Sequence, residues 1–125
     1  MVKKIFHFHG KTIEELKELS LEEFAELIPS RQRRSIKRNS EIHKKILKKV
    51  KEKNEAKTHL RDAIVVPGMV GKTIKIHNGK EFVPVIIQED MLGCFLGELA
   101  MTRRKVNHSA PGIGATKSSS SMSMK

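Results

Sequence analysis

Hydrophobic residues recur at helical spacing near the start of the chain, and each group follows a residue that commonly begins a helix. Thr12 and Ser20 are each followed three positions later by a glutamate, the capping-box pattern in which hydroxyl and carboxylate satisfy backbone N–H groups. The pattern predicts two short helices, and Pro29 ends the second. Their buried faces are expected to carry Ile13, Leu16 and Leu19 in the first helix and Leu21, Phe24, Leu27 and Ile28 in the second.

The next segment keeps helical spacing but is strongly basic. Ser30 is predicted to cap a basic helical turn over residues 31–38, and Ser40 to cap a helix that runs to about Lys53. One side of this longer helix is apolar, which predicts that it packs on the core. The apolar positions are Ile42, Ile46, Leu47 and Val50.

Beyond the helices the pattern becomes typical of β-strands. Residues 54–62 are interpreted as a linker, and residues 63–66 as a strand that a Pro-Gly pair ends. Residues 73–77 alternate between apolar and polar, which predicts a strand with Ile74 and Ile76 facing inward.

A hairpin is predicted to follow this strand. Asn78 and Gly79 are a two-residue type I′ turn signal, because both residues accept positive φ at little cost. The return strand is predicted over residues 80–87, and Pro84 marks it as an edge strand because proline has no N–H to donate. A short helical segment is expected to open at residues 88–90.

These elements predict an α+β fold, with a small three-stranded mixed sheet from about residue 63 to 87, N-terminal helices and an extended basic C-terminal tail. We expect a helical, basic extension over residues 1–61, an α+β core over residues 62–102 and a flexible tail over residues 103–125. The tail is rich in Gly, Ser, Ala and Pro, and such a composition does not offset the entropy lost on ordering.

The composition points to a polyanionic partner. The 125 residues include 25 Lys and Arg against 14 Asp and Glu, giving a formal net charge of +11 and a pI near 10.0. The positive charge is concentrated in residues 31–61 and 103–125, which flank a nearly neutral segment. Neighbouring cations repel one another without a counter-charge, so phosphate contacts are predicted for the cluster of Arg31, Arg33, Arg34, Lys37 and Arg38.

The expected mode of nucleic-acid binding does not rely on aromatic stacking. The chain has no Trp or Tyr, and Phe24, Phe82 and Phe95 fall on predicted core faces. It therefore lacks the exposed aromatic side chains that commonly stack single-stranded bases. We expect recognition of a folded RNA by its shape, mainly through phosphates. The alternative is a free RNA chaperone or a non-specific nucleic-acid-binding protein, which would bind any duplex with comparable affinity.

Signals for catalysis or metal binding are weak. His7 and His9 have no Cys, Asp or further His nearby, which makes them poor zinc ligands. Other candidate positions are better explained by turns or by core packing: Gly68 and Gly71, Gly112 and Gly114, Cys94, and the carboxylates Glu89, Asp90 and Glu98. We therefore predict that the protein is not an enzyme and needs no cofactor or metal.

The compartment is also constrained. The chain contains one cysteine, Cys94, which cannot form an internal disulfide and fits a reducing environment. No apolar run approaches the roughly 20 residues needed to span a bilayer, and the first residues are too short and polar for a secretory signal. We expect a soluble, cytoplasmic protein.

Several short motifs occur in a fixed order. They are Pro-x-Met-Val-Gly at 67–71, Asn-Gly-Lys at 78–80, Asp-Met-Leu-Gly at 90–93, Leu-Gly-Glu at 96–98, a threonine at 102 ahead of basic residues, and Pro-Gly-Ile-Gly-Ala-Thr at 111–116. Together they resemble the universal small-subunit ribosomal protein nineteen family. The N-terminal helices and residues 27–38 resemble its archaeal and eukaryotic branch, whose eukaryotic counterpart is small-subunit protein fifteen.

The resemblance implies a structural constituent of the small ribosomal subunit. Members of the family bind small-subunit rRNA in the head of the subunit, beside ribosomal protein thirteen, and their C-terminal tail reaches toward the decoding region and tRNA. Matched residue by residue, the implied RNA-facing positions are Arg31, Arg33, Arg34, Arg38, Thr58, His59, Arg61, Lys72, Lys80, Arg103, Arg104, Lys105 and His108. Lys117 is a further cation of the tail that suits an anionic surface.

A few positions depart from the family pattern, and one implied RNA-facing residue has an alternative role. Gly68, Cys94 and Leu99 stand where glutamate, histidine and an aromatic residue are common, and the last five residues differ from the usual apolar ending. A local ion pair between Arg61 and Asp62 is an alternative to RNA contact by Arg61.

Overall fold

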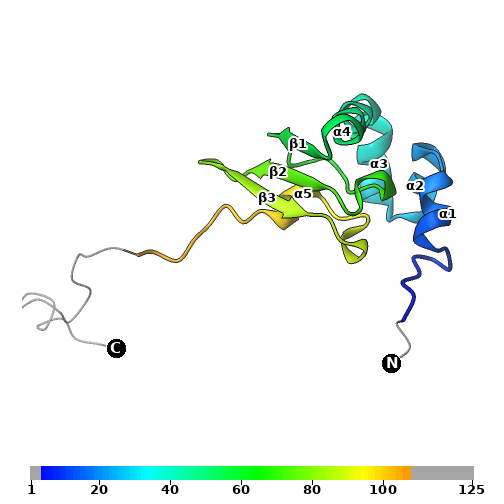
Figure 1. Ribbon diagram of the computed structural model, residues 1–125. Helices are drawn as coiled ribbons and strands as arrows, with labels where there is room; N and C mark the ends of the chain where they lie inside the picture. The colour runs from blue at the N-terminus through cyan, green and yellow to red at the C-terminus, as the bar shows by residue number, and fades with distance from the viewer. Residues whose placement is uncertain (1–3, 108–125) are drawn as a thin grey trace, which may run out of the picture.

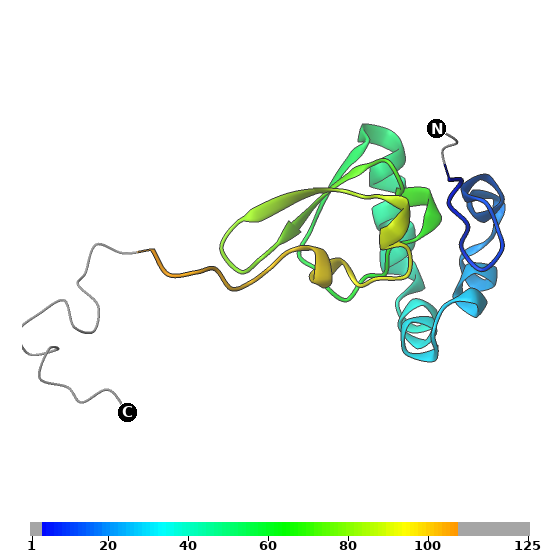
Figure 2. The same ribbon diagram turned by 90° about the horizontal axis from the view of Figure 1, so that it is seen from below.

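Helices occupy most of the first half of the chain, and a small sheet with short helical pieces follows, in the computed structural model, which describes residues 4–107 (Figure 1). None of the helices within these residues is long and apolar enough to cross a membrane. In chain order the elements are α1 (Ile13–Glu18), α2 (Leu21–Leu27), α3 (Ser30–Arg38), α4 (Ser40–Lys53), β1 (Glu55–Thr58), the 3-10 helix η1 (Pro67–Met69), β2 (Thr73–His77), β3 (Phe82–Ile86), the 3-10 helix η2 (Glu89–Met91) and α5 (Leu96–Leu99). Figures 1 and 2 place α1 and α2 at the end opposite the β2–β3 hairpin, with α4 between them.

The first two helices confirm the prediction from the capping boxes. The backbone N–H of Thr12 donates to Oε2 of Glu15 over 2.9 Å, and that of Ser20 donates to Oε2 of Glu23 over 2.8 Å. Both hydroxyls accept a backbone N–H in return. Both helices are short, so their stability depends on the apolar side chains that they bury against the core, chiefly Leu16, Phe24 and Ala25.

The basic helices α3 and α4 form where they were predicted, but Ser30 and Ser40 do not cap them. Each serine is the first helical residue, and the caps are Pro29 and Asn39, which make no side-chain capping bond. Asn39 is both the C-cap of α3 and the N-cap of α4, so Ser40 already lies inside α4. Because Asn39 caps both helices, no separate capping turn lies between them.

The sheet is three-stranded and mixed, which confirms the predicted α+β class. Its order is β1-β2-β3, with β1 parallel to β2 and β2 antiparallel to β3. Ala56 lies opposite Ile74, and Thr58 opposite Ile76; all four side chains are buried. β3 is an outer strand, which explains how Pro84 fits within it.

The first strand of the sheet is not the one predicted. Residues 54–62 were interpreted as a linker but contain β1, whereas residues 63–66 are not a strand of the sheet. Residues 63–66 are fully buried, and their backbone bonds run to residues 93–96 and to a histidine side chain. The apolar composition of residues 63–66 thus indicated a buried segment, not a strand of the sheet. The half-polar segment β1 is instead the strand at the edge of the sheet, paired with β2. The expected boundary at residues 61/62 falls inside the sheet unit.

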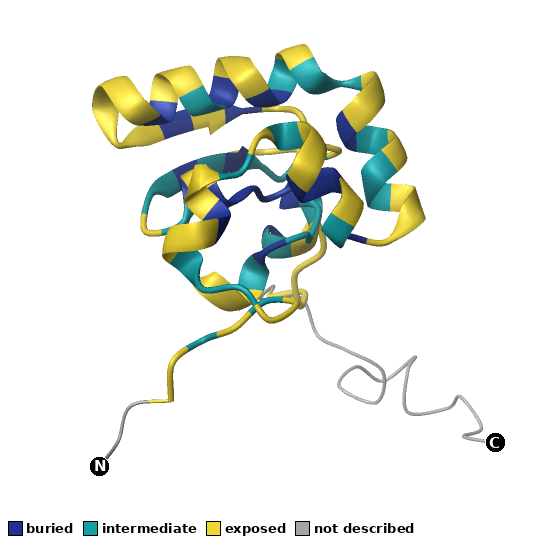
Figure 3. Cartoon of the chain, turned by 90° about the vertical axis from the view of Figure 1, so that its right-hand side faces the viewer, coloured by how far each residue is buried: buried dark blue, intermediate teal, exposed yellow. Residues whose placement is uncertain are grey.

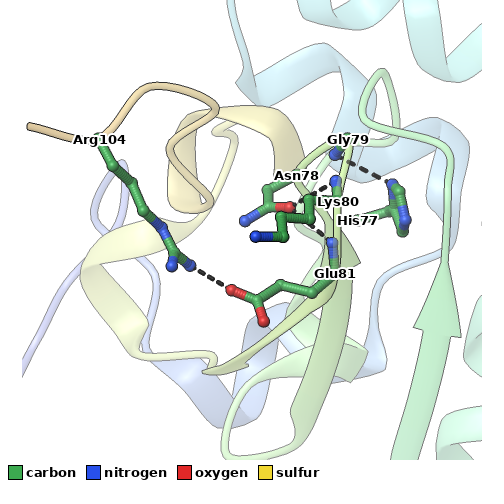
Figure 4. Close-up of polar contacts among 6 residues, drawn as sticks. All are labelled: His77, Asn78, Gly79, Lys80, Glu81 and Arg104. Atoms are coloured by element: carbon green, nitrogen blue, oxygen red, sulfur yellow. Dashed lines mark hydrogen bonds and ion pairs between the residues drawn. The ribbon is translucent and has the colours of Figure 1, made fainter. Parts of the chain in front are cut away.

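The β2–β3 connection also differs from the type I′ turn that was predicted. It spans four residues, from Asn78 to Glu81, and of these Gly79 has positive φ (+101°) whereas Asn78 does not. The side chain of Asn78 accepts hydrogen bonds from the N–H groups of Lys80 and Glu81, both at 2.9 Å (Figure 4). These side-chain bonds replace those of the tighter turn, and β3 therefore begins at Phe82.

One hydrophobic core joins the helices to the sheet. In Figure 3 the buried positions gather on the inner sides of the helices, toward the middle of the molecule. The core receives side chains from α1 to α4, from residues 63–66, from β2 and from α5; its largest members include Leu16, Phe24, Ile36, Ile64, Ile74, Ile76 and Leu96. The N-terminal helices therefore pack into the same core as the sheet.

The segment after β3 contains two short helical pieces where one was predicted. η2 ends at Met91, and α5 begins at Leu96. Gly93 lies between them with a φ of +80°, a conformation that favours glycine. This turn lets residues 93–96 run beside residues 63–66, with which they share hydrogen bonds.

Candidate nucleic-acid interface

Three arginines of α3 converge on one groove. Arg31, Arg34 and Arg38 follow one another at spacings of three and four residues, which places them on one face of the helix. All three are exposed. They line a groove of about 310 Å³ whose other walls are Ser35, Asn39, Asp62 and Phe95. We call this the arginine groove.

The arginine groove is well suited to an anion. Guanidinium groups bind phosphate oxygens in a bidentate manner and stay charged at all ordinary pH values. Within residues 4–107, no carboxylate forms an ion pair with any of its arginines; the ion pairs there are Lys75–Glu55 and Arg104–Glu81. Asp62 contributes the one acidic side chain of the groove lining.

Lys37 does not belong to this groove. It lines a second groove with Glu22, Glu26 and Lys44, between α2, α3 and the start of α4. Lys37 follows Arg34 at a spacing of three residues, so it lies at the flank of the arginine face and is turned toward α2 rather than into the arginine groove. The structure therefore brings together three members of the predicted basic cluster and separates Lys37 from them.

Arg33 has a role within the fold. Its Nε donates to the carbonyl of Ala25 over 3.1 Å, and its Nη2 donates to the carbonyls of Glu26 and Ile28, both at 3.2 Å. These carbonyls lie at the C-terminal end of α2, where backbone acceptors lack helical partners. The half-buried Arg33 thus joins α2 to α3. This structural role was not predicted from the sequence, which indicated only a surface cation.

Arg61 joins two more distant elements. Its Nη1 donates to the carbonyl of His77 over 2.8 Å, and its Nη2 donates to those of Gly97 and Ala100, both at 2.5 Å. Within residues 4–107 it forms these bonds and no ion pair with Asp62, so the alternative of a local pair was wrong. Its guanidinium connects the end of β2 to α5.

Thr58 and His59 differ in exposure although they are neighbours. Thr58 is 6% exposed, and its hydroxyl accepts the N–H of Leu60 over 3.0 Å, so its side chain completes the end of β1 inside the molecule. His59 is exposed on the opposite face of the sheet. Of the two, His59 is available to a ligand in this structure.

The prediction that Phe82 faces the core was wrong. Phe82 pairs with His77 across β2 and β3, and its partly exposed ring lies against the rings of His77 and His59. Val83 and Val85 take the inward positions opposite Ile76 and Ile74. The cause is the four-residue hairpin connection, which sets which residues of β3 alternate inward.

The other predicted lysine and arginine sites within residues 4–107 are Lys72, Lys80, Arg103, Arg104 and Lys105. Nζ of half-buried Lys72 contacts Oδ1 of Asn54, while Lys80 is exposed in the hairpin connection. Arg104 pairs with Glu81 of the same connection (Figure 4). Arg103 and Lys105, on either side of Arg104, are exposed. The predicted sites His108 and Lys117 lie outside the described residues.

Titratable groups suited to catalysis are sparse in the described part of the chain. No group of three or more His, Cys, Asp or Glu side chains there could hold a metal ion. Cys94 is partly buried, and this burial raises the pKa of its thiol above the ordinary value, which disfavours the nucleophilic thiolate.

His43 is a fully buried polar residue that was not predicted from the sequence. Its spacing of three residues from Ile46 and seven from Val50, on the buried face of α4, was the signal that could have predicted its burial.

A comparison with known protein families gives a match to this chain. The sequence model of the family described as Ribosomal protein S19 matches residues 34–108 of the 125 residues. The match begins inside α3, covers two of the three arginines of the groove, and includes the whole sheet and α5. α1 and α2 precede it.

Proposed function

Since the chain belongs to the ribosomal protein S19 family, and is therefore an RNA-binding constituent of the small ribosomal subunit, we propose that it binds small-subunit rRNA in the head through the arginine groove. The convergence of Arg31, Arg34 and Arg38 carries this proposal. Phosphate groups of a folded RNA offer the counter-charge that these side chains lack within residues 4–107.

A second contact surface is proposed at the sheet end of the molecule. Lys80, Arg103 and Lys105 are exposed there, and residues 103–107 follow α5 on the same side as the hairpin (Figures 1 and 2). Cations at both ends of the domain would let it bridge two rRNA segments. The tail residues His108 and Lys117 extend this proposal toward the decoding region and tRNA, with ribosomal protein thirteen as a neighbour.

The predicted RNA-facing residues do not all have the same role in the proposal. Arg33, Arg61 and Thr58 are engaged inside the fold, so their effect on RNA binding is indirect. Lys72 contacts Asn54, and Lys37 lies beside acidic residues of α2. The direct contacts proposed are Arg31, Arg34, Arg38, His59, Lys80, Arg103, Arg104, Lys105, His108 and Lys117.

Salt dependence of binding to an RNA fragment from the small-subunit head tests the proposal. The logarithm of the association constant should fall linearly with the logarithm of salt concentration, by roughly 0.7 to 0.9 per phosphate contacted. The double variant Arg34→Ala/Arg38→Ala should bind more weakly and show a smaller slope. The variant Lys45→Ala/Lys48→Ala loses the same charge from an exposed face of α4 and serves as the control.

Co-sedimentation separates this function from its alternative. The protein should migrate with small subunits on a sucrose gradient, and the groove variant should shift toward the top. Comparable affinity for unrelated duplexes, together with absence from the subunit fractions, would instead indicate a free RNA chaperone or a non-specific nucleic-acid-binding protein.

A further inference from the structure

One face of the sheet is directed away from the core. The buried residues Ala56, Ile74 and Ile76 fill the inward positions, so the alternate residues of each strand point outward. Ile86, at the end of β3 on this outward face, is 64% exposed, which shows that the face is open to solvent. The other outward residues are Glu55, Lys57, Thr73, Lys75, His77, Phe82 and Pro84.

Three rings lie together at one end of this open face. The ring centroids of His59 and His77 are 4.6 Å apart, those of His59 and Phe82 are 4.9 Å apart, and those of His77 and Phe82 are 5.0 Å apart. His59 is the most exposed of the three and rests on the other two. We call these three residues the aromatic platform.

The strand register builds the aromatic platform. Thr58 is the partner of Ile76, so His59 follows on the outward side next to His77, and His77 is itself opposite Phe82. Nδ1 of His77 accepts the N–H of Gly79 over 3.0 Å, which holds the ring in place (Figure 4). The rings are therefore arranged before any ligand binds, which lowers the entropic cost of binding.

The charges around the aromatic platform favour a nucleic acid. Nζ of Lys57 lies 5.5 Å from the centroid of the Phe82 ring, and Lys80 is exposed in the adjoining hairpin connection. The nearby carboxylates of Glu55 and Glu81 are each paired with a cation, Lys75 and Arg104. A flat ring flanked by available cations matches a nucleobase flanked by phosphates.

From this geometry we propose that the aromatic platform stacks an unpaired base of the rRNA, with His59 as the contacting ring. The inference rests on the proposed function and adds a second mode of recognition to it. Phosphate contacts at the arginine groove position the RNA, whereas stacking at the aromatic platform requires a base that is free of its helix. The scarcity of Trp, Tyr and exposed Phe predicted recognition mainly through phosphates. That prediction considered only these three residue types, whereas two of the three rings of the aromatic platform are histidines.

The variant His59→Trp reports base stacking directly through fluorescence. The chain has no Trp or Tyr, so full-length protein carrying His59→Trp has a single indole fluorophore. We expect its fluorescence to be quenched by a single-stranded RNA of about eight adenosines, a length within the usual site size for such binding. An abasic oligonucleotide with the same number of phosphates should cause little quenching. Circular dichroism of the variant establishes that it folds.

Affinity measurements on other variants test the same contact without a new fluorophore. His59→Ala should weaken binding of the oligoadenylate about tenfold, the order expected for loss of one base stack, and leave binding of the abasic strand unchanged. His59→Phe should retain the affinity because it keeps an aromatic face. His7→Ala removes an exposed histidine outside the aromatic platform and should have no effect.

Equal quenching by the two oligonucleotides, or an unchanged affinity in His59→Ala, would overturn the stacking proposal and leave the open face to a protein partner. Neither outcome affects the salt-dependent binding of head rRNA through Arg34 and Arg38, which tests the proposed function separately. If the binding of head rRNA did not depend on salt while the oligoadenylate still quenched the fluorescence of His59→Trp, the role of the arginine groove would be refuted and the stacking proposal would stand.

Discussion

Nε2 of His43 accepts a hydrogen bond from the backbone N–H of Ile64 over 2.9 Å. Nδ1 of the same ring lies 2.8 Å from the carbonyl oxygen of Asn39. Because Nε2 accepts, the proton resides on Nδ1, and the neutral ring joins the α3–α4 junction to residues 63–66. His43 is 0% exposed, and its burial lowers its pKa below the ordinary value of 6.5.

The protein should therefore lose stability on mild acidification. In the unfolded chain His43 takes up a proton as the pH falls through 6.5, whereas in the folded protein it does so at a lower pH. The stabilisation is thus complete above pH 6.5 and declines as the pH falls from there toward the folded pKa. Urea unfolding of the wild type and of His43→Gln, measured from about pH 7.5 to about pH 5.5, checks this. The same pH slope in both proteins would assign the effect to other groups.

Replacing Arg33 should destabilise the fold. Arg33→Ala leaves three carbonyls at the end of α2 without their charged donor, and we expect a loss of about 2 kcal/mol in the free energy of unfolding. This revises the expectation that Arg33 and Arg34 are equivalent surface cations. The matched control is Arg34→Ala, next in sequence and exposed, which should stay within about 0.5 kcal/mol of the wild type. Equal unfolding energies for the two variants would show that the bonds of Arg33 contribute little.

Arg61 should not be replaceable by lysine. Its planar group reaches the carbonyls of His77, Gly97 and Ala100 together, and a single ammonium does not reproduce this fork. We expect Arg61→Lys to lower the free energy of unfolding by about 2 kcal/mol, measured by urea denaturation. Arg104→Ala removes an exposed arginine that pairs with Glu81 and should cost less than about 1 kcal/mol. A harmless Arg61→Lys change would indicate that charge alone is required.

Deletion of residues 110–125 should separate folding from function. Every buried core residue of the described chain lies at or before Ala100, so circular dichroism and incorporation into small subunits should be nearly unchanged. Arg103, Arg104 and Lys105 remain in the truncated protein. We expect tRNA-dependent steps of translation to suffer, as measured in a reconstituted system with wild-type subunits as the control. Failure to assemble would instead assign rRNA anchoring to the deleted residues.

Local sequence was sufficient for several elements. α1 and α2 were predicted because a capping box depends on residues three positions apart, and β2 because alternation and a following turn signal lie within a few residues. The α+β class and the family could also be predicted, since both depend on the order of such signals along the chain.

Tertiary structure decided the first strand and the hairpin. In Glu55–Thr58 polar and small residues alternate, as they do in many segments that are not strands. This segment is a strand because it pairs in parallel with β2. Residues 63–66 are more apolar, yet their backbone pairs with residues 93–96 and His43. Such pairing depends on which segments meet in space, so local propensity does not determine it.

Tertiary structure also decided which cations are available to a ligand. Arg33 and Arg34 are adjacent and chemically identical, but successive residues of a helix point about 100° apart. One side chain therefore meets the carbonyls of α2, and the other opens into the arginine groove. The sequence by itself determined that the segment is a basic helix; the roles of its arginines were set only by what packs against each side of that helix.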